Sequence, residues 1–139
     1  MAVGHTGGVE CGGVFMGQKT NAAYCLAPMA MRWYHTYDLD YAKKVYPFVI
    51  EVVNFWEDYL KLENGRYVIH NDSIQESSGP DFNNPLSLGL VRNAFSLALD
   101  MSKEMGVDAA RRAKWQHILA NLSKFATFEK DGLTVFRYS

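Results

Sequence analysis

The chain has 139 residues, a length that fits one domain with a core of its own. Its hydrophobic fraction of 48% and its charged fraction of 21% are typical of a globular protein. The net charge of -1 and the lack of any basic run argue against nucleic acid as a partner. No apolar run approaches the ~20 residues needed to cross a bilayer, so we expect no membrane partner either.

Residues 1–19 form a glycine-rich N-terminal segment, for which we expect irregular backbone or disorder. They do not form a phosphate-binding loop, because no apolar strand precedes the glycines and the Gly-Lys-Ser/Thr ending is missing. They also lack the charged start and the apolar stretch of a signal peptide. The localisation therefore stays open, and a periplasmic or secreted parent is compatible with a signal that was removed. Cys11 and Cys25 have no metal-site spacing, so we expect free thiols.

The first predicted helix runs from about residue 20 to Tyr37. Its apolar stripe consists of Leu26, Met29, Ala30, Trp33 and Tyr37. Pro28 lies inside this segment, and because it removes one backbone donor it is expected to kink the helix or to mark its true start. Trp33, like Trp56 and Trp115 further along the chain, lies on an apolar helical face and is predicted to be a core residue.

A second helix is predicted after Asp38 or Asp40, either of which can cap it. Pro47 is compatible with this helix if it lies in the first turn. Glu57 and its neighbour Asp58 point about 100° apart on a helix, so their carboxylates do not easily converge. We therefore predict a solvated face for this acidic pair rather than a catalytic dyad.

A polar loop, residues 70–84, separates the second helix from the third. An Asn-Gly turn and a short extended segment lead into it. The loop has too few apolar residues to form a core element, and it contains the carboxylates of Asp72, Glu76 and Asp81. A polar loop held between rigid helices is where binding and catalytic groups are usually placed.

Two further helices and a β-hairpin are predicted after the loop. Asn83 or Asn84 caps the third helix, Gly106 ends it, and Asp108 caps the fourth. The connection between these helices is so short that we expect them to pack antiparallel. Residues 127–137 are predicted to form a β-hairpin. The predicted fold class is therefore mainly α, with antiparallel helical hairpins and short β-hairpins.

An ordered set of short segments carries a resemblance to a known family. The segments are Thr36–Asp38, Tyr46–Phe48, Phe55–Leu60, Gly65–Ile69, Gln75–Ser78, Asn84–Leu88 and Asp131–Phe136. Together they resemble the six-hairpin (α/α) barrel glycoside hydrolases, in particular the part around the acid residue in the inverting α-L-fucosidase-like branch. The resemblance covers residues 15–137. It implies an incomplete (α/α)6 toroid, with residues 20–139 as a helical-hairpin domain that is part of a larger barrel.

The resemblance implies that Glu76 is the glutamate that protonates the leaving oxygen of a glycosidic bond. Such hydrolysis needs a second carboxyl-type group, which lies ~6.5–9.5 Å away in inverting enzymes. The resemblance implies that this second group lies outside this chain, in the rest of the barrel. A general acid needs a pKa raised towards neutrality, which Asp72 and Asp81 on the same loop would favour. The alternative for Glu76 is a solvated loop carboxylate or a helix cap.

The predicted substrate-binding residues are His70, Asp72, Gln75, Asp81 and Tyr34. For His70 a purely structural hydrogen bond stays an open alternative. For Asp72 and Asp81 the alternatives are turn residues or ligands of a calcium ion, which would need six or more oxygens. The 4 histidines show no ligand spacing, so neither a metal nor a cofactor is predicted.

The sequence therefore predicts a segment of a glycoside hydrolase that acts on an oligosaccharide or a glycoside. The alternative is a non-catalytic helical binding or oligomerisation module. A partial barrel would leave apolar helix faces exposed, so the expected protein partner is the remainder of the barrel or a second copy of the chain.

Overall fold

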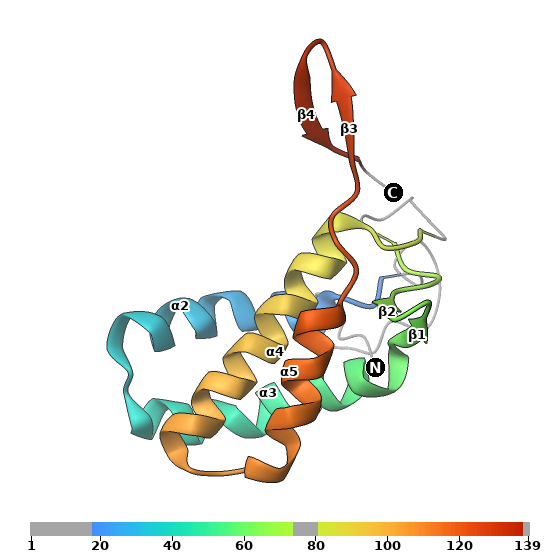
Figure 1. The fold of residues 1–139 in the computed structure, drawn as a ribbon. Coiled ribbons are helices and arrows are strands. Elements are labelled where there is room, and N and C mark those ends of the chain that lie inside the picture. Colours follow the sequence, from blue (N-terminus) through green and yellow to red (C-terminus); the bar gives the residue numbers. More distant parts are fainter. Residues whose placement is uncertain (1–17, 74–80, 138–139) are drawn as a thin grey trace.

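The computed structural model describes residues 18–73 and 81–137, and these are mainly helical (Figure 1). The helices are α1 (Asn21–Tyr24), α2 (Leu26–Thr36), α3 (Leu39–Tyr59), α4 (Pro85–Met105), the 3₁₀ turn η2 (Ala109–Arg111) and α5 (Arg112–Asn121). The strands are β1 (Lys61–Glu63), β2 (Arg66–Val68), β3 (Thr127–Lys130) and β4 (Leu133–Phe136). The predicted fold class is confirmed. The glycine-rich segment predicted for residues 1–19 lies almost wholly outside the described residues.

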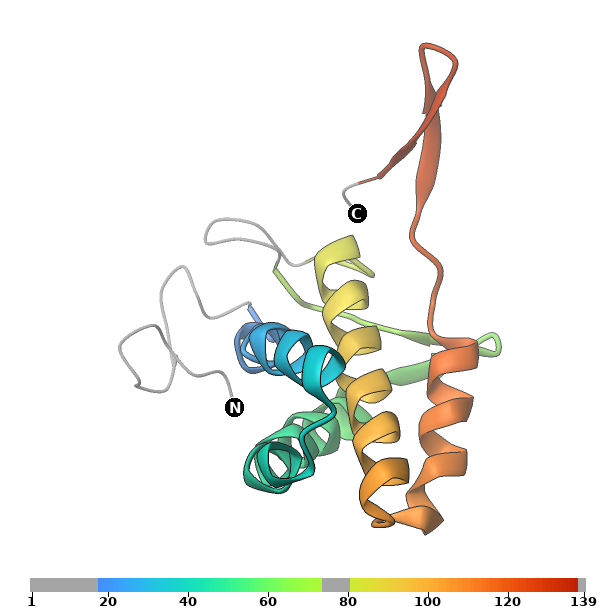
Figure 2. The same ribbon diagram turned by 90° about the vertical axis from the view of Figure 1, so that its left-hand side faces the viewer.

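Helix α4 is the central element of the core. It contacts α1, α2, α3 and α5, and Figure 2 shows it between the α2–α3 pair and α5. A broad face of α4 has no accessible surface and consists of Leu88, Val91, Ala94, Phe95, Leu97, Ala98 and Met101. Burial of a side chain of leucine or phenylalanine size contributes ~1.5–3 kcal/mol, so this face is a large part of the core energy. Helices α4 and α5 lie side by side and antiparallel, as their short connection predicted.

The helix predicted over residues 20–37 is divided in two at Cys25. Pro28 explains the break, because it has no N–H to donate to the carbonyl of Tyr24, four residues before it. Helix α2 begins at Leu26 and therefore places Pro28 in its first turn, where that N–H would lack a helical partner in any case. Of the two alternatives for Pro28, the one in which it marks the true start of the helix is confirmed.

Helix α3 decides between the two predicted caps and shows where Pro47 lies. Asp38 is the cap, since its Oδ1 accepts hydrogen bonds from the backbone N–H groups of Asp40 and Tyr41 at 3.0 and 3.1 Å. The sequence made Pro47 compatible with this helix only in a first turn, but Pro47 lies in the interior of one continuous helix. A proline there costs ~3 kcal/mol. Buried residues on both sides, Ala42 before it and Val49 after it, hold the helix together across the missing hydrogen bond.

The start of the last helix differs from the prediction at Asp108. This residue has a positive φ of 50°, and its side chain makes no capping hydrogen bond to η2. Its carboxylate instead accepts a 2.8 Å hydrogen bond from the hydroxyl of Tyr46 on α3. Gly106 ends α4 as predicted, with a φ of 70° that favours glycine.

Two antiparallel hairpins complete the described fold. In the first, β1 pairs with β2 through a turn at Asn64 and Gly65, both with positive φ. In the second, β3 pairs with β4 through the predicted turn at Asp131 and Gly132, which also have positive φ. Figures 1 and 2 show this second hairpin projecting away from the helices. Its exposed apolar side chains include Phe136, at 69% exposure.

Candidate functional site

The two ends of the polar loop are joined at its base. Asp72 and Asp81 form an isolated antiparallel bridge, with N···O distances of 3.2 Å from Asp72 N to Asp81 O and 2.6 Å in the other direction. The chain therefore leaves and returns at one place, next to the N-terminus of α4. Glu76, predicted as the general acid, and Gln75, predicted to bind substrate, lie outside the described residues.

The carboxylate of Asp72 is fully buried and accepts four hydrogen bonds. Its Oδ1 accepts from the backbone N–H groups of Lys19 and Ser73, both at 2.8 Å. Its Oδ2 accepts from Nδ2 of Asn84 at 3.4 Å and from the hydroxyl of Ser87. The positive end of the α4 dipole also favours a negative charge at this point. Asp72 has no surface in the described structure with which to touch a ligand, and its predicted substrate contact stays a prediction.

The returning strand of the loop is held by two asparagines. Asn83 has a positive φ of 50° and pairs with Ile69: its N–H donates to Ile69 O at 2.9 Å, and its Oδ1 accepts from Ile69 N at 2.8 Å. Asn84 is the cap of α4, because its Oδ1 accepts from Ser87 N at 2.8 Å. The sequence left Asn83 and Asn84 as alternatives for this cap, and the structure selects Asn84.

An aromatic surface lies beside the base of the loop. Nε2 of His70 is 2.8 Å from Oε1 of Glu63, and the His70 ring is 4.9 Å from the ring of Phe82. Phe82 is 48% exposed. Tyr59 holds the same segment by donating to His70 O at 2.7 Å, and burial, followed by the charge of Asp72, raises the pKa of this tyrosine. Phe82 is not among the site residues predicted from the sequence, and its signal was a bulky apolar side chain inside an otherwise polar loop.

Tyr34 lies away from these residues. It borders a hollow of about 190 Å³ with Asp100 and Lys103, towards the C-terminal end of α4. Asp100 is thirteen residues beyond Ser87, which corresponds to roughly 20 Å along a helix. Burial, followed by the charge of Asp100, raises the pKa of Tyr34. The structure therefore brings His70, Asp72 and Asp81 together and leaves Tyr34 apart.

A larger hollow of about 410 Å³ lies between the start of α1 and α3. Its lining includes Lys19 and the aromatic residues Phe48, Phe55 and Trp56. Lys19 also donates its backbone N–H to Asp72, so this hollow adjoins the residues that hold the loop. The indole N–H of Trp56 is buried and has no acceptor within the described residues.

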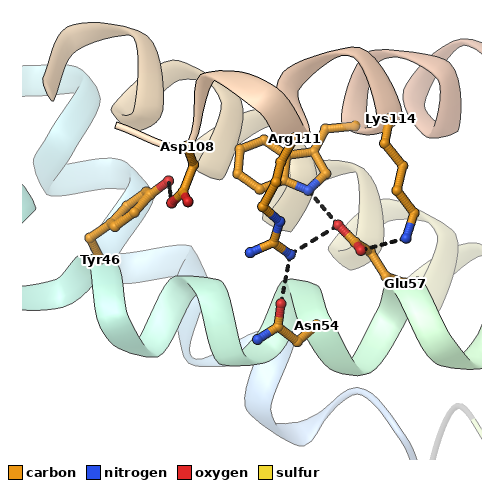
Figure 3. Close-up of polar contacts among 7 residues, drawn as sticks. Tyr46, Asn54, Glu57, Asp108, Arg111 and Lys114 are labelled. Carbon is orange, nitrogen blue, oxygen red and sulfur yellow. Dashed lines mark hydrogen bonds and ion pairs between the residues drawn. The ribbon is translucent and has the colours of Figure 1, made fainter. Parts of the chain in front are cut away.

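Glu57 does not lie on a solvated face, which contradicts the sequence prediction. Its side chain is 11% exposed and is enclosed by groups from η2 and α5 (Figure 3). Oε1 accepts from Arg111 at 3.0 Å and from the indole of Trp115 at 2.5 Å, while Oε2 accepts from Lys114 at 2.6 Å. Arg111 also donates to Oδ1 of Asn54 at 2.6 Å. The prediction failed because these partners are more than fifty residues away in the sequence, whereas only the adjacent Asp58 was compared.

Further predictions concern the tryptophans, metals and membranes. Trp33, Trp56 and Trp115 are fully buried, which confirms them as core residues. Across residues 18–73 and 81–137, no cluster of histidine, cysteine, aspartate and glutamate is suited to a metal ion. In the same two ranges no helix has the length and apolarity to cross a membrane.

A comparison with known families matches nearly the whole chain. Residues 3–134 match the family model described as glycosyl hydrolase family 95 catalytic domain. The match includes the loop and all the residues that hold its base. No curated protein matches the chain.

Proposed function

The chain belongs to the glycosyl hydrolase family 95 catalytic domains, and from this premise we propose that it supplies the general acid of an inverting α-L-fucosidase-like enzyme, with Glu76 as proton donor. Glycoside hydrolysis is the activity of the family as a whole. The branch, the inverting outcome and the role of Glu76 are our proposal. An oligosaccharide or other glycoside is the substrate class that goes with it.

The observation that carries the proposal is the fixed base of the loop. A general acid must be held within hydrogen-bond reach of the oxygen that it protonates. The Asp72–Asp81 bridge joins the two ends of the loop to each other, and the Asn83–Ile69 pair joins the returning end to the residue after β2. The carboxylate of Asp72 accepts from Asn84 and Ser87 at the start of α4. A loop whose two ends are fixed in this way is suited to present a side chain to a substrate.

The reaction follows from the proposed role. Glu76 donates its proton to the glycosidic oxygen as the bond from that oxygen to the anomeric carbon breaks. A water molecule, activated by a second group elsewhere in the active site, attacks the same carbon from the opposite face. The two groups need ~6.5–9.5 Å between them to leave room for this water. The released sugar then has the inverted configuration.

We assign sugar binding to the aromatic surface next to the loop. Phe82 presents an exposed ring, on which the apolar face of a sugar would stack, and His70 presents its imidazole beside it. The hydrogen bond to Glu63 holds that imidazole in place. Gln75 and Asp81 stay proposals as further contacts. A contact with Tyr34 would require a substrate that extends roughly 20 Å along α4.

The decisive experiment is Glu76→Gln in the full-length protein, assayed on an α-L-fucosyl oligosaccharide and on 2,4-dinitrophenyl α-L-fucoside. Loss of general acid catalysis is expected to lower kcat on the oligosaccharide by ~10²–10⁴-fold. The dinitrophenyl substrate needs little protonation of its leaving group, so its loss should be much smaller. Asp58→Asn, an exposed carboxylate on α3, is the matched control and should leave both rates unchanged. Full activity of Glu76→Gln would reject the role, and failure of the wild type on both fucosides would reject the branch.

A non-catalytic interaction module is the second candidate, and one observation favours it. The β3–β4 hairpin and the outer side of α1 and α2 carry exposed apolar side chains, among them Tyr24, Met31, Leu133 and Phe136. Such side chains mark interaction surfaces. Self-association of this chain in sedimentation, combined with no hydrolysis by the full-length protein, would favour this second candidate.

A further inference from the structure

The hollow between the start of α1 and α3 takes no part in the proposed reaction. Its volume of about 410 Å³ falls in the range of ~300–1,000 Å³ that is typical of sites for small ligands. Such sites are mostly apolar, with a few polar groups that orient the ligand. This hollow has the same composition, since aromatic and aliphatic side chains lie beside one lysine, one asparagine and two carboxylates. It is therefore a candidate binding site in addition to the aromatic surface at the loop.

One face of α3 supplies most of the lining. Phe48, Glu51, Val52 and Phe55 occupy positions i, i+3, i+4 and i+7, which lie on the same side of a helix. The two phenylalanines are half-buried, and the exposed Glu51 lies between them along the helix. A carboxylate thus lies one turn away from each of two aromatic rings.

The two rings are not equivalent. Phe55 is stacked on Tyr59, with ring centroids 5.4 Å apart and an angle of 14° between the ring planes. One face of the Phe55 ring is therefore already covered by another ring. Phe48 is the better platform for a ligand, and Glu51 is the acceptor one turn further along α3.

The hollow also contains hydrogen-bond donors. Lys19 lines it from the segment before α1. Asn54 lines it from α3, and its Oδ1 accepts from Arg111 at 2.6 Å, while Figure 3 shows the amide nitrogen on the side away from Arg111. A ligand that both donates and accepts hydrogen bonds would therefore find partners here.

The charges in the lining narrow the class of ligand. Lys19 carries one positive charge, and Glu51 and Asp58 carry two negative charges, so the lining has a net charge of about -1 and disfavours an anion such as a phosphate ester. The lysine disfavours a cation for the same reason. A hydrocarbon would leave the polar groups without partners, at a cost in free energy. A neutral ring with hydroxyl groups on its edge and an apolar C–H face matches all of these features, and a pyranose sugar is such a ring.

We propose that this hollow is a second sugar-binding site, in which a neutral pyranose ring stacks on Phe48 and donates a hydroxyl hydrogen bond to Glu51. Asn54 donates from its amide to a second ring oxygen. Asp58 lies seven residues beyond Glu51, roughly 10 Å along α3, and is out of reach of the same ring. The inference goes beyond the proposed function and does not depend on the role of Glu76.

Nuclear magnetic resonance of the ¹⁵N-labelled chain tests the proposal through its tryptophan indoles. The indole of Trp33 donates to Asp100 at 2.9 Å and that of Trp115 donates to Glu57 at 2.5 Å, whereas Trp56 lines the hollow. We expect methyl α-L-fucopyranoside or methyl α-D-glucopyranoside to shift the indole signal of Trp56 and to leave the other two signals in place. The dissociation constant should be on the order of 1 mM, as for a ligand of about a dozen non-hydrogen atoms. Trp56→Phe assigns the signal.

Three variants test the predicted contacts. Glu51→Gln removes the charge from the acceptor and should weaken binding ~5-fold. Phe48→Leu keeps an apolar side chain but removes the ring, and should weaken binding ~3–10-fold. Asp58→Asn is the matched control for Glu51→Gln, because it removes a carboxylate from the same hollow without removing a contact, and should leave the dissociation constant unchanged. If Phe48→Leu does not fold, Glu51→Gln against Asp58→Asn decides the question.

Three further probes test the class of ligand. Choline tests a cationic ligand, α-L-fucose 1-phosphate an anionic one, and cyclohexanol an apolar ring with a single hydroxyl. All three should shift the Trp56 signal less than the methyl glycosides do at the same concentration. An equal or larger shift with any of them would overturn the assignment to sugars.

The last control separates this hollow from the loop. Phe82→Ala removes the ring to which we assign sugar binding beside the loop, and it should leave the shift of Trp56 unchanged. A shift that disappears in Phe82→Ala would mean that the sugar binds at the loop, and the second site would be rejected. It would equally be rejected if neither methyl glycoside shifted the Trp56 signal, or if all three indoles shifted together. None of these results would alter the case for Glu76, which rests on the rates of hydrolysis.

Discussion

The contacts of Glu57 allow a quantitative prediction about how α3 is joined to α5. In Glu57→Ala the buried indole N–H of Trp115 loses its acceptor, which costs ~1–3 kcal/mol. Arg111 loses a charged partner but keeps Asn54, which adds ~1 kcal/mol. We therefore expect the free energy of unfolding to fall by ~3 kcal/mol, near the lower end of the range for a broken buried ion pair. Lys114 is 55% exposed, so Lys114→Ala should cost less than ~1 kcal/mol.

Glu57→Gln separates charge from hydrogen bonding at the same position. The amide oxygen can still accept from Trp115, so the expected cost at pH 7 is only ~1 kcal/mol. Burial acts to raise the pKa of Glu57, but hydrogen bonds from Lys114, Trp115 and Arg111 outweigh it and hold the pKa below the ordinary value of 4.5. The charge therefore contributes its full stability above pH 4.5, and this contribution is lost as the pH falls through the lowered pKa.

Urea unfolding followed by circular dichroism at pH 7 and at pH 3 measures both effects. The difference between the wild type and Glu57→Gln should shrink at pH 3, because below the ordinary pKa of 4.5 the unfolded chain takes up the proton and the contribution of the charge to stability falls. The reasoning would be refuted if Glu57→Ala cost no more than Lys114→Ala. It would equally be refuted if the Gln variant stayed less stable by the same amount at both pH values.

Two further predictions concern α4. Gly89 lies in the interior of α4 and an added Cβ would meet no atom within 4 Å, so Gly89→Ala should stabilise the protein by ~0.5–1 kcal/mol in thermal unfolding. Gly132→Ala, in the turn between β3 and β4, has equally open surroundings but a φ of +78°, so it should destabilise the protein. A lower melting temperature for Gly89→Ala than for the wild type would contradict this reasoning. Arg92 donates from α4 to the carbonyls of Leu122 and Ser123 at 3.2 and 2.8 Å, so Arg92→Ala should cost ~1.5–3 kcal/mol. Arg92→Lys should recover only part of that loss, because a single ammonium group cannot also replace Nη1, which donates to Leu119 O at 3.5 Å. Full recovery in urea unfolding would count against this reasoning.

Local features of the fold were predictable because they depend on neighbours in the sequence. Asp38 and Asn84 cap their helices through backbone groups two or three residues away. Gly106 ends α4 because of its own backbone freedom. The same holds for the Asp131-Gly132 turn, whose residues adopt positive φ themselves. Each of these required only a few consecutive residues.

Features that depend on distant partners were not predictable from the same information. The surroundings of Glu57 come from residues more than fifty positions further on, and one of the donors to Asp72 comes from a segment 53 residues earlier. Pro47 in the interior of α3 is tolerated because of tertiary packing that no local pattern reveals. Tyr34 was grouped with the loop on residue type alone, although the length of α4 separates them.

The arrangement of the described helices and strands predicts that the rate of backbone hydrogen exchange differs between them. Hydrogen exchange should be fastest in the β3–β4 arm, where a two-stranded ribbon has little beneath it, and slowest in α4, which is surrounded by other helices. The polar loop, residues 70–84, therefore leads directly into α4, the element that we expect to open last. A catalytic side chain must keep one orientation from one turnover to the next, and attachment of its loop to a rigid helix helps to keep that orientation.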